Sequence, residues 1–346
     1  MAIQKISIQA YIALQDNHLL IDVRSPSEFE HAHIINAKSL PLFTNEERAL
    51  VGTTYKQKSR EAAIKIGLPL FGTKLLSMIE QVESWVHDFH HPTPVLVVHC
   101  WRGGMRSSAV AWLLDLYGFK VYQLIGGYKA YRNWVLEQFN HPYSIKVLGG
   151  YTGSGKTEIL LELKKRNHAV IDLEGLAHHK GSAFGAIGQA IQPTQEMFEN
   201  TLAHQLHSLQ NSQKTIWVED ESQRIGSVII PTEFFKQMRG SVCYFITIPF
   251  EERLQFIVSA YGNFALQDLL DASLRIQKRL GGLETKNVVQ FLNENKIDAA
   301  FSILLSYYDK WYAKHSQNST QPKLIVLPIT SDKVDPILNA SLLEKL

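Results

Sequence analysis

Cys100 is the residue in this sequence best suited to nucleophilic chemistry. It ends the apolar run VLVVHC, and the loop WRGGMR leads from it into the helical pattern SSAVAWLLDLYG. A cysteine reacts as its thiolate, a form that backbone N–H groups at the start of a helix favour. Gly103 and Gly104 permit a tight loop, and Arg102 and Arg106 can hold a polyatomic anion. We therefore predict an anion cradle around a reactive Cys100; the alternative is a buried structural cysteine.

A second candidate site is the segment GYTGSGKT, residues 150–157. It matches the phosphate-binding pattern G-x-x-x-x-G-K-[ST] and has the strand-like IKVLG before it and the helical TEILLELKK after it, as this motif requires. Lys156 is expected to neutralise the outer oxygens of a diphosphate, and Thr157 to face Mg²⁺; no other direct metal contact is predicted. The diphosphate-binding residues that we predict are Gly150, Gly153, Ser154, Gly155, Lys156 and Thr157.

A phosphate-binding loop of this kind needs acidic partners at the ends of neighbouring strands. The segment VEDE supplies Glu219, Asp220 and Glu221, and IDLEG supplies Asp172 and Glu174. We predict that Asp172, Glu219 and Asp220 contact a metal-bound water or act as a general acid or base. The alternative for each is an exposed carboxylate in a turn.

Alternating strands and helices must position both sites. The runs HLLIDVR and VLVVHC are apolar and end in polar residues, which is typical of parallel strands, and helical patterns follow them. This alternation predicts an α/β fold with parallel sheets. It is interrupted at NHPYS and resumes with SIKVLGG. We therefore predict two α/β domains, residues 1–143 with Cys100 and residues 144–346 with the phosphate-binding loop.

The segment DVRSPSEFEHAHIINA resembles an element of rhodanese domains. The resemblance implies an N-terminal rhodanese-like parallel-sheet domain in which Asp22, Arg24, Glu28 and His33 hold the fold together. The spacing H-C-x-x-G-x-x-R-S is one residue longer than the usual rhodanese loop and matches that of cysteine-dependent phosphatases. We expect the wider loop around Cys100 to accept a tetrahedral anion.

As a whole, the chain resembles the tRNA 2-selenouridine synthase family, in which a rhodanese-like domain precedes a P-loop NTPase-like α/β domain. The resemblance rests on CWRGGMRS, GGYKAYR, GTTYKQ, GGYTGSGKTEIL, DLEGLAHHKGSAFG and EDES. It implies a tRNA substrate with 2-thiouridine at the wobble position. The sulfur would first be geranylated from geranyl diphosphate and then replaced by selenium from selenophosphate.

The same resemblance implies roles for the two sites and for partners. Cys100 would carry selenium as a selanylcysteine, and the loop Gly150–Thr157 would bind the diphosphate of geranyl diphosphate. Selenophosphate and geranyl diphosphate are then substrates, no tightly bound cofactor is expected, and Mg²⁺ is the one ion to consider. A selenophosphate-supplying enzyme is an expected partner.

Composition sets limits on the class of protein. Of 346 residues, 45% are hydrophobic and 20% charged, and the formal net charge is +2, which describes a globular and only mildly basic chain. Basic segments 164–166 and 275–279, with Lys129 and Arg132, are candidate contacts to tRNA phosphates; a solvated helix face is the alternative. With two cysteines and no apolar run of membrane length, we expect a cytoplasmic protein without a membrane partner.

Other readings remain open for the function and for smaller patterns. A cysteine phosphatase fused to a nucleotide-dependent kinase, and a rhodanese scaffold with a nucleotide switch, are the rival functions. Cys243 in SVCYFITIP is expected to be a small core residue. Aromatic residues at 307, 308, 311 and 312 have a helical spacing that is more typical of a core than of a base-stacking surface.

Overall fold

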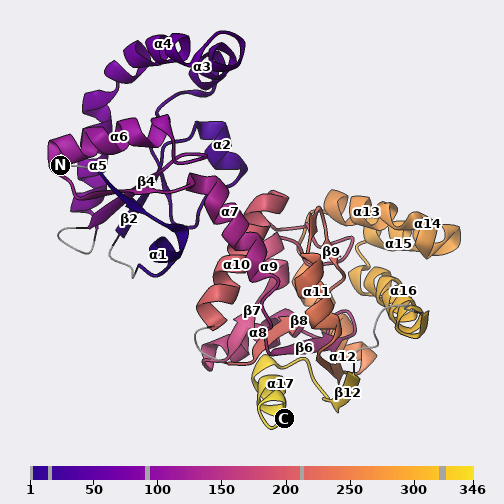
Figure 1. Ribbon diagram of the computed structural model, residues 1–346. Coiled ribbons are helices and arrows are strands. Elements are labelled where there is room, and N and C mark those ends of the chain that lie inside the picture. The colour runs from indigo at the N-terminus through magenta and orange to yellow at the C-terminus, as the bar shows by residue number, and fades with distance from the viewer. Residues whose placement is uncertain (1–2, 15–17, 90–93, 211–213, 319–324) are drawn as a thin grey trace. The chain divides into compact units, whose positions relative to one another are not determined.

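The structure, a computed structural model, describes residues 3–14, 18–89, 94–210, 214–318 and 325–346 (Figure 1). It separates into two compact units, Met1–Glu137 and Gln138–Leu346. The predicted boundary at residue 143 lies a few residues beyond this division. Each unit is an α/β structure built on its own parallel sheet, as the strand and helix patterns predict.

The first unit contains a five-stranded sheet in the order β1-β5-β4-β2-β3, with all neighbouring strands parallel. Since parallel strands end at one edge of a sheet, Asp22 at the end of β2 and Cys100 after β4 come to the same edge. The strands are β1 (Gln4–Ile6), β2 (His18–Asp22), β3 (Lys38–Ser39), β4 (Val95–His99) and β5 (Val121–Leu124). The helices are α1 (Ile8–Ile12), α2 (Pro26–His31), α3 (Asn45–Gln57), α4 (Arg60–Gly72), α5 (Leu75–His87), α6 (Met105–Tyr117) and α7 (Gly127–Gln138).

The core of the first unit lies between the sheet and helices α5 and α6. Met78 and Val82 of α5 and Val110 and Leu114 of α6 are buried in one cluster with residues of β2 and β4. Helices α3 and α4 form a pair that packs side by side and extends beyond the sheet (Figure 1). The sheet therefore fixes the Cys100 loop, while α3 and α4 are an addition inserted between β3 and α5.

The second unit contains another five-stranded parallel sheet, in the order β12-β11-β6-β8-β7, and a short antiparallel pair, β9 and β10. The strands are β6 (Ile145–Gly150), β7 (Ala169–Ile171), β8 (Ile216–Glu219), β9 (Arg224–Ile225), β10 (Val228–Ile229), β11 (Val242–Thr247) and β12 (Ile325–Thr330). The helices are α8 (Lys156–Lys165), α9 (Leu173–Ala177), α10 (Gln195–Gln210), α11 (Thr232–Arg239), α12 (Phe250–Tyr261), α13 (Leu266–Arg275), α14 (Gln277–Leu280), α15 (Gly282–Asn293), α16 (Ile297–Asn318) and α17 (Pro336–Leu343).

Two apolar clusters stabilise the second unit. One joins the sheet to α8 and α17, and the other joins α12, α13, α15 and α16 to Phe184. Cys243, on β11, is 1% exposed, which confirms the prediction of a core position. Neighbouring strands β11 and β12 are separated along the chain by helices α12 to α16, so this helical cluster lies between two adjacent strands.

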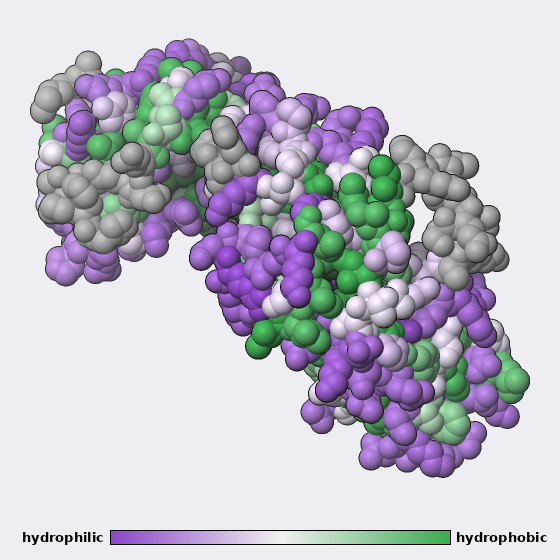
Figure 2. Space-filling view, turned by 90° about the horizontal axis from the view of Figure 1, so that it is seen from below, coloured by the Kyte–Doolittle hydropathy of each residue, from purple (hydrophilic) through white to green (hydrophobic). Residues whose placement is uncertain are grey.

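Apolar side chains also reach the surface of the second unit. Edge strand β12 exposes Ile325, Val326 and Leu327, and α17 exposes Ile337 and Leu338. Figure 2 shows hydrophobic residues gathered on the visible face of this unit. Within the described ranges no single helix is long and apolar enough to cross a membrane, whereas α4 and α5, bent by 60° to one another, pass that test of length and composition as a pair.

Candidate functional sites: a cysteine loop and a phosphate-binding loop

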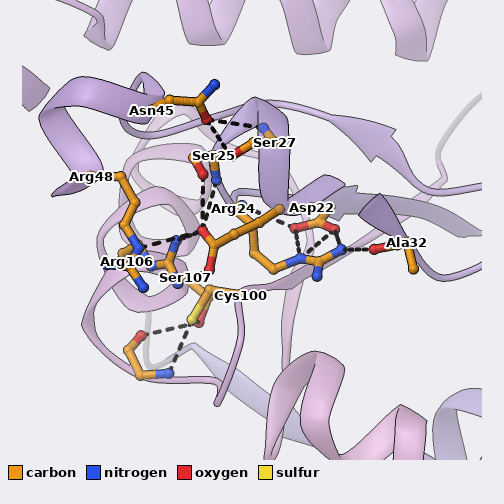
Figure 3. A network of polar contacts seen from close by, with 12 residues as sticks. Asp22, Arg24, Ser25, Ser27, Ala32, Asn45, Arg48, Cys100, Arg106 and Ser107 are labelled. Carbon is orange, nitrogen blue, oxygen red and sulfur yellow. Dashed lines mark hydrogen bonds and ion pairs between the residues drawn. The ribbon is translucent and has the colours of Figure 1, made fainter. Parts of the chain in front are cut away.

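The Cys100 sulfur lies at the start of helix α6. Cys100 follows β4 and is 4% exposed. Its Sγ receives a hydrogen bond from the Gly104 N–H at 3.4 Å and lies 3.3 Å from Ser107 Oγ (Figure 3). An N–H donor to a sulfur at a helix N-terminus stabilises negative charge there. The structure thus gives Cys100 the surroundings that nucleophilic or chalcogen-carrying chemistry needs.

Residues of β5 and of the segment after it hold this loop through hydrogen bonds. The Tyr128 N–H donates to the Cys100 carbonyl at 2.9 Å, and the Lys129 N–H donates to the Trp101 carbonyl at 2.9 Å. Gln123 Nε2 donates to the Gly103 carbonyl at 2.9 Å and to Ser107 Oγ at 2.9 Å. The GGYKAYR segment is therefore part of the cysteine site. Sequence reasoning missed Gln123, for which the motifs offer no signal.

Arg106 is not aimed at an open anion site in this structure. Its Nη1 and Nη2 donate to the Glu28 carboxylate at 2.6 and 3.2 Å, and Arg48 Nε lies 3.7 Å from the same group. Glu28 also closes the capping box of α2 by accepting from the Ser25 N–H at 3.1 Å. Burial raises the pKa of Glu28, but hydrogen bonds and the charge of Arg106 outweigh this effect and lower it to about 2.

The predicted cradle is therefore only partly assembled. Gly104 contacts the sulfur, and Gly103 makes the turn at φ +65°. Glu28 holds the Arg106 guanidinium and the Arg102 side chain is exposed to solvent, so the binding of an anion by these two arginines stays a prediction.

A buried ion pair fixes the neighbouring strand end. Arg24 Nε and Nη2 donate to the Asp22 carboxylate at 2.6–3.0 Å, and Nη2 also donates to the Ala32 carbonyl at 2.7 Å. The guanidinium lies 3.9 Å from the centre of the Tyr128 ring. The charged groups are satisfied on every side, as burial requires. This confirms the prediction that Asp22 and Arg24 hold the first unit together.

The phosphate-binding loop connects β6 to α8, as its motif predicts. Gly153 and Gly155 have φ of +82° and +70°, and a Cβ on Gly153 would lie 2.7 Å from Ile257 Cδ1. Lys156 Nζ donates to the Gly150 carbonyl at 3.2 Å. Ser154 is fully buried, and its hydroxyl donates to the Tyr151 carbonyl at 2.7 Å. The loop is thus pre-formed for an anion at the N-terminus of α8.

Three glutamates, Glu174, Glu219 and Glu221, gather next to Thr157. Thr157 Oγ1 donates to Glu219 Oε1 at 2.7 Å and lies 3.1 Å from Glu174 Oε2. One oxygen from each of the three carboxylates lies within 4.8 Å of the others. Glu219 is fully buried, and its Oε2 has no partner among the described residues. Carboxylate and hydroxyl oxygens at this spacing suit a divalent cation such as Mg²⁺.

Crowding shifts the titration of these carboxylates. Burial, then the charge of Glu221, raises the pKa of Glu174 to about 8. Burial, then the charge of Glu219, raises the pKa of Glu221 to about 7. Burial and the charge of Glu174 raise the pKa of Glu219 well above its ordinary value. Like charges brought together out of water are expected to share protons or bind a cation.

Of the five carboxylates named at the strand ends, Glu174, Glu219 and Glu221 lie in this cluster, and the other two have other partners. Asp172 caps α9 by accepting from the Gly175 N–H at 2.7 Å. Asp220 forms an ion pair with Arg239. The roles predicted for Asp172 and Asp220 therefore fall to Glu174 and Glu221, which the motifs DLEG and EDES also contain.

A cavity of about 230 Å³ opens beside the phosphate-binding loop. Its polar end is lined by residues 152–158 with Glu174, Lys180 and Glu221. Its other walls are apolar and aromatic, with contributions from α12 (Phe256, Ile257, Ala260, Tyr261), α16 (Phe301, Leu304, Leu305, Tyr308, Trp311, Tyr312) and Phe184. The expectation of a core role for the aromatic stripe is thus corrected for Tyr308, Trp311 and Tyr312, because a second face of α16 lines the cavity.

The predicted phosphate contacts have different surroundings. Arg166 is bound by Glu162 at 3.0 Å and by Glu344 at 2.8 Å, so it ties α8 to the C-terminal segment. Lys129, Lys278 and Arg279 have exposed side chains.

A cysteine-bearing sheet followed by a phosphate-binding-loop sheet defines a rhodanese-like domain joined to a P-loop domain. The family model of the rhodanese-like domain matches residues 8–133, and that of the tRNA 2-selenouridine synthase AAA domain matches residues 143–341. A tRNA 2-selenouridine synthase of Hydrogenovibrio crunogenus is 36% identical over 325 residues, which cover 85% of this chain and 88% of that relative. One of Nitrosomonas europaea is 39% identical over 248 residues, 70% of this chain and 63% of that relative. The chain belongs to the tRNA 2-selenouridine synthase family.

Proposed function

We propose that this protein converts 2-thiouridine at the wobble position of tRNA into 2-selenouridine in two steps. The second unit transfers the geranyl group of geranyl diphosphate to the sulfur, and the first unit replaces the geranylated sulfur with selenium from selenophosphate. The names of the relatives support the overall conversion. The partners are the tRNA and an enzyme that supplies selenophosphate.

The observation that supports the first step is the lining of the cavity in the second unit, which is polar at one end and apolar on its other walls. The N–H groups of the P-loop and Lys156 offer a diphosphate its ligands, and Phe256, Leu304 and Trp311 offer apolar contacts. Geranyl diphosphate has this same division into a charged head and a hydrocarbon tail. A nucleotide is the second candidate ligand, because Trp311 and Tyr312 could stack on a base.

In the proposed geranylation, the nucleobase sulfur attacks the first carbon of the geranyl group. The bond from that carbon to oxygen breaks, the diphosphate leaves with the electron pair, and the N3 proton of the nucleobase is released. Lys156 and the N–H groups of the loop stabilise the negative charge that develops on the diphosphate. A divalent cation, which Thr157, Glu174, Glu219 and Glu221 would hold, supplies further charge neutralisation when bound.

In the proposed second step, Cys100 starts as a mixed disulfide with a small thiol, and water cleaves selenophosphate into phosphate and selenide. Selenide attacks the Cys100 sulfur and displaces the small thiol, so that Cys100 carries selenium as a selanylcysteine. The terminal selenium then attacks C2 of the geranylated base, the C2–S bond breaks and geranylthiol leaves; the small thiol attacks Cys100, the S–Se bond breaks, and 2-selenouridine is released as the mixed disulfide forms again. The Gly104 N–H donates to the Cys100 sulfur at the N-terminus of α6. This N–H and the helix N-terminus would stabilise a terminal selenium anion as they stabilise a thiolate.

The test is a nucleoside mass analysis. The protein is incubated with tRNA containing 2-thiouridine, geranyl diphosphate, Mg²⁺ and selenophosphate, and the tRNA is digested. We expect 2-selenouridine in the complete reaction and S-geranylated 2-thiouridine when selenophosphate is withheld. An unchanged nucleoside in both reactions would reject the proposal, and hydrolysis of a phosphomonoester by the same protein would then favour the phosphatase reading.

A further inference from the structure

The turn between α3 and α4 carries four exposed cations. Lys56 is in the last turn of α3, Lys58 caps it, and Arg60 and Lys65 belong to α4. We call residues 55–65 the α3–α4 tip. Among the described residues none of these four cations has an acidic partner within ion-pair distance.

Other cations of the same unit do have acidic partners. Arg48 and Arg106 share Glu28, and Lys74 is paired with Glu47. The one acid in the tip is Glu61, whose pKa is lowered by its own backbone N–H, by the Ser59 hydroxyl at the start of α4 and, to a smaller extent, by the charge of Arg60. Four cations and one carboxylate give the tip a formal charge of +3, larger than the +2 of the whole chain. Such a local surplus creates a positive potential at the surface.

Helix stability does not account for this charge. A lysine in the last turn of α3 interacts favourably with the helix dipole, which explains Lys56. Arg60, however, is the first residue of α4, where a cation opposes the positive end of the dipole. The charge of Arg60 lowers the pKa of the neighbouring Glu61, but no carboxylate of the described residues lies within ion-pair distance of its guanidinium, so we expect Arg60 to serve binding rather than folding.

Helix α3 connects the tip to the cysteine site. Arg48, in its first turn, lies 3.7 Å from Glu28, which in turn holds Arg106 of the Cys100 loop. Ten residues of helix separate Arg48 from Lys58, a rise of about 15 Å. The tip is therefore separated from the Arg48–Glu28–Arg106 contacts by a distance that a few nucleotides of RNA can span. Tyr55, which is 51% exposed in the tip, adds an aromatic face of the kind that stacks on bases.

We propose that the α3–α4 tip binds the phosphate backbone of the tRNA close to the nucleotide that reaches Cys100. The proposal rests on the proposed function for the identity of the polyanion. Lysine and arginine side chains on a phosphate backbone release counterions, so binding through the tip must weaken as salt is added.

The experiment compares two triple variants of the full chain with equal changes in charge. The tip variant is Lys56→Gln, Lys58→Gln and Lys65→Gln. The control variant is Lys5→Gln, Lys38→Gln and Lys120→Gln, which are also exposed and belong to the same unit. Lys120 precedes β5 and lies at the end of the sheet opposite Cys100, and Lys5 and Lys38 belong to the two edge strands, β1 and β3. The affinity for tRNA containing 2-thiouridine is measured at several salt concentrations.

Each phosphate contact contributes about 0.7 to 0.9 to the slope of log affinity against log salt. We expect the slope of the tip variant to be smaller than that of the wild type by about two to three, and the slope of the control variant to be unchanged. The KM for tRNA should rise in the tip variant at an unchanged kcat. Equal slopes and affinities for the two variants would overturn the proposal.

A further set of measurements distinguishes a failure of the tip proposal from a failure of the proposed function. Vesicles of anionic lipid serve as a second polyanion; loss of vesicle binding in the tip variant with undiminished tRNA binding would assign the tip to a membrane surface and reject our proposal. If the tip variant binds tRNA as the wild type does and the wild type makes 2-selenouridine, only the tip proposal fails. If the wild type binds no tRNA even at low salt, the proposed function and the tip proposal fail together.

Discussion

Gly127 lies directly against the carbonyl of Cys100. A Cβ at this position would be 2.2 Å from the Cys100 oxygen and 2.6 Å from the Gly103 nitrogen. The backbone of Gly127 is also left-handed, with φ of +54°. The start of α7 and the cysteine loop are therefore packed backbone to backbone, and the shape of the loop depends on a residue that is distant in sequence.

Replacing Gly127 with alanine is expected to destabilise the first unit by roughly 2–5 kcal/mol, since left-handed strain adds to an overlap with backbone atoms. Gly104→Ala is the matched control, because a Cβ there meets nothing within 4 Å and its φ is −102°. It should cost less than about 1 kcal/mol. Urea unfolding measures both, and equal losses of stability would contradict the packing described.

Replacing Cys100 with serine should stop the reaction at the geranylated nucleoside. The hydroxyl cannot carry selenium under these conditions, whereas the P-loop unit is unaltered. Mass analysis should show 2-selenouridine at background and S-geranylated 2-thiouridine accumulating. Cys243→Ala is the control, since this thiol is buried in β11; it should retain both steps. Selenium insertion by the Cys100 variant at the wild-type rate would rule out a selanylcysteine.

Binding measurements on two variants can separate the head and the tail of the ligand. Lys156→Ala removes a charged contact worth about 1.5–3 kcal/mol, so both geranyl diphosphate and inorganic diphosphate should bind about 10- to 100-fold more weakly. Phe256→Ala should weaken geranyl diphosphate alone. Unchanged geranyl diphosphate affinity in the lysine variant would exclude the P-loop as its site, and tighter binding of ATP than of geranyl diphosphate would favour a nucleotide.

Magnesium binding should depend on Glu219. Glu219→Gln removes the charge of the most buried carboxylate of the cluster, so Mg²⁺ should bind at least about tenfold more weakly and should no longer raise the unfolding temperature. Glu162→Gln, on α8 beside Arg166, is the control and should bind Mg²⁺ as the wild type does. Calorimetric titration of the metal alone decides between these results. Equal affinities would exclude Glu219 as a ligand.

The Glu28–Arg106 pair predicts a pH dependence of stability. The pKa of Glu28 is lowered from 4.5 to about 2, so the folded state holds this proton less tightly than the unfolded state. The contribution is complete above pH 4.5, at most about 3 kcal/mol, and disappears as the pH falls through 2. Glu28→Gln should flatten this part of the stability curve of the first unit. An equally steep curve in the variant would assign the acid sensitivity to other groups.

The motifs predicted both loops and the edge of each sheet where they lie. Cys100 and the segment Gly150–Thr157 follow apolar strands and precede helices, and backbone geometry at such junctions is a local property of the sequence. The fold class followed from the same alternation of strands and helices.

Partners that depend on distant contacts could not be predicted. Arg106 is paired with Glu28, which lies 78 residues earlier, so its direction is set by the tertiary fold. The aromatic residues of α16 have the spacing of a core helix, and only the packing of α12 and α15 determines which face is left to line a cavity. Asp172 and Glu174 differ in role for a similar reason. Asp172 caps α9, whereas Glu174, in the first turn of that helix, contacts Thr157.

The apolar wall of the cavity belongs to helices α12 to α16, which the chain forms between the neighbouring strands β11 and β12. The entropic cost of closing such a long connection grows with the logarithm of its length, so doubling the length of the connection raises this cost by only about 0.6 kcal/mol. Insertions among helices α13 to α16 therefore cost the sheet little entropy, whereas α12 packs on the P-loop through Ile257. If the cavity binds geranyl diphosphate, as we propose, sequence changes in α13 to α16 would alter which hydrocarbon fits and would leave the phosphate-binding loop unchanged.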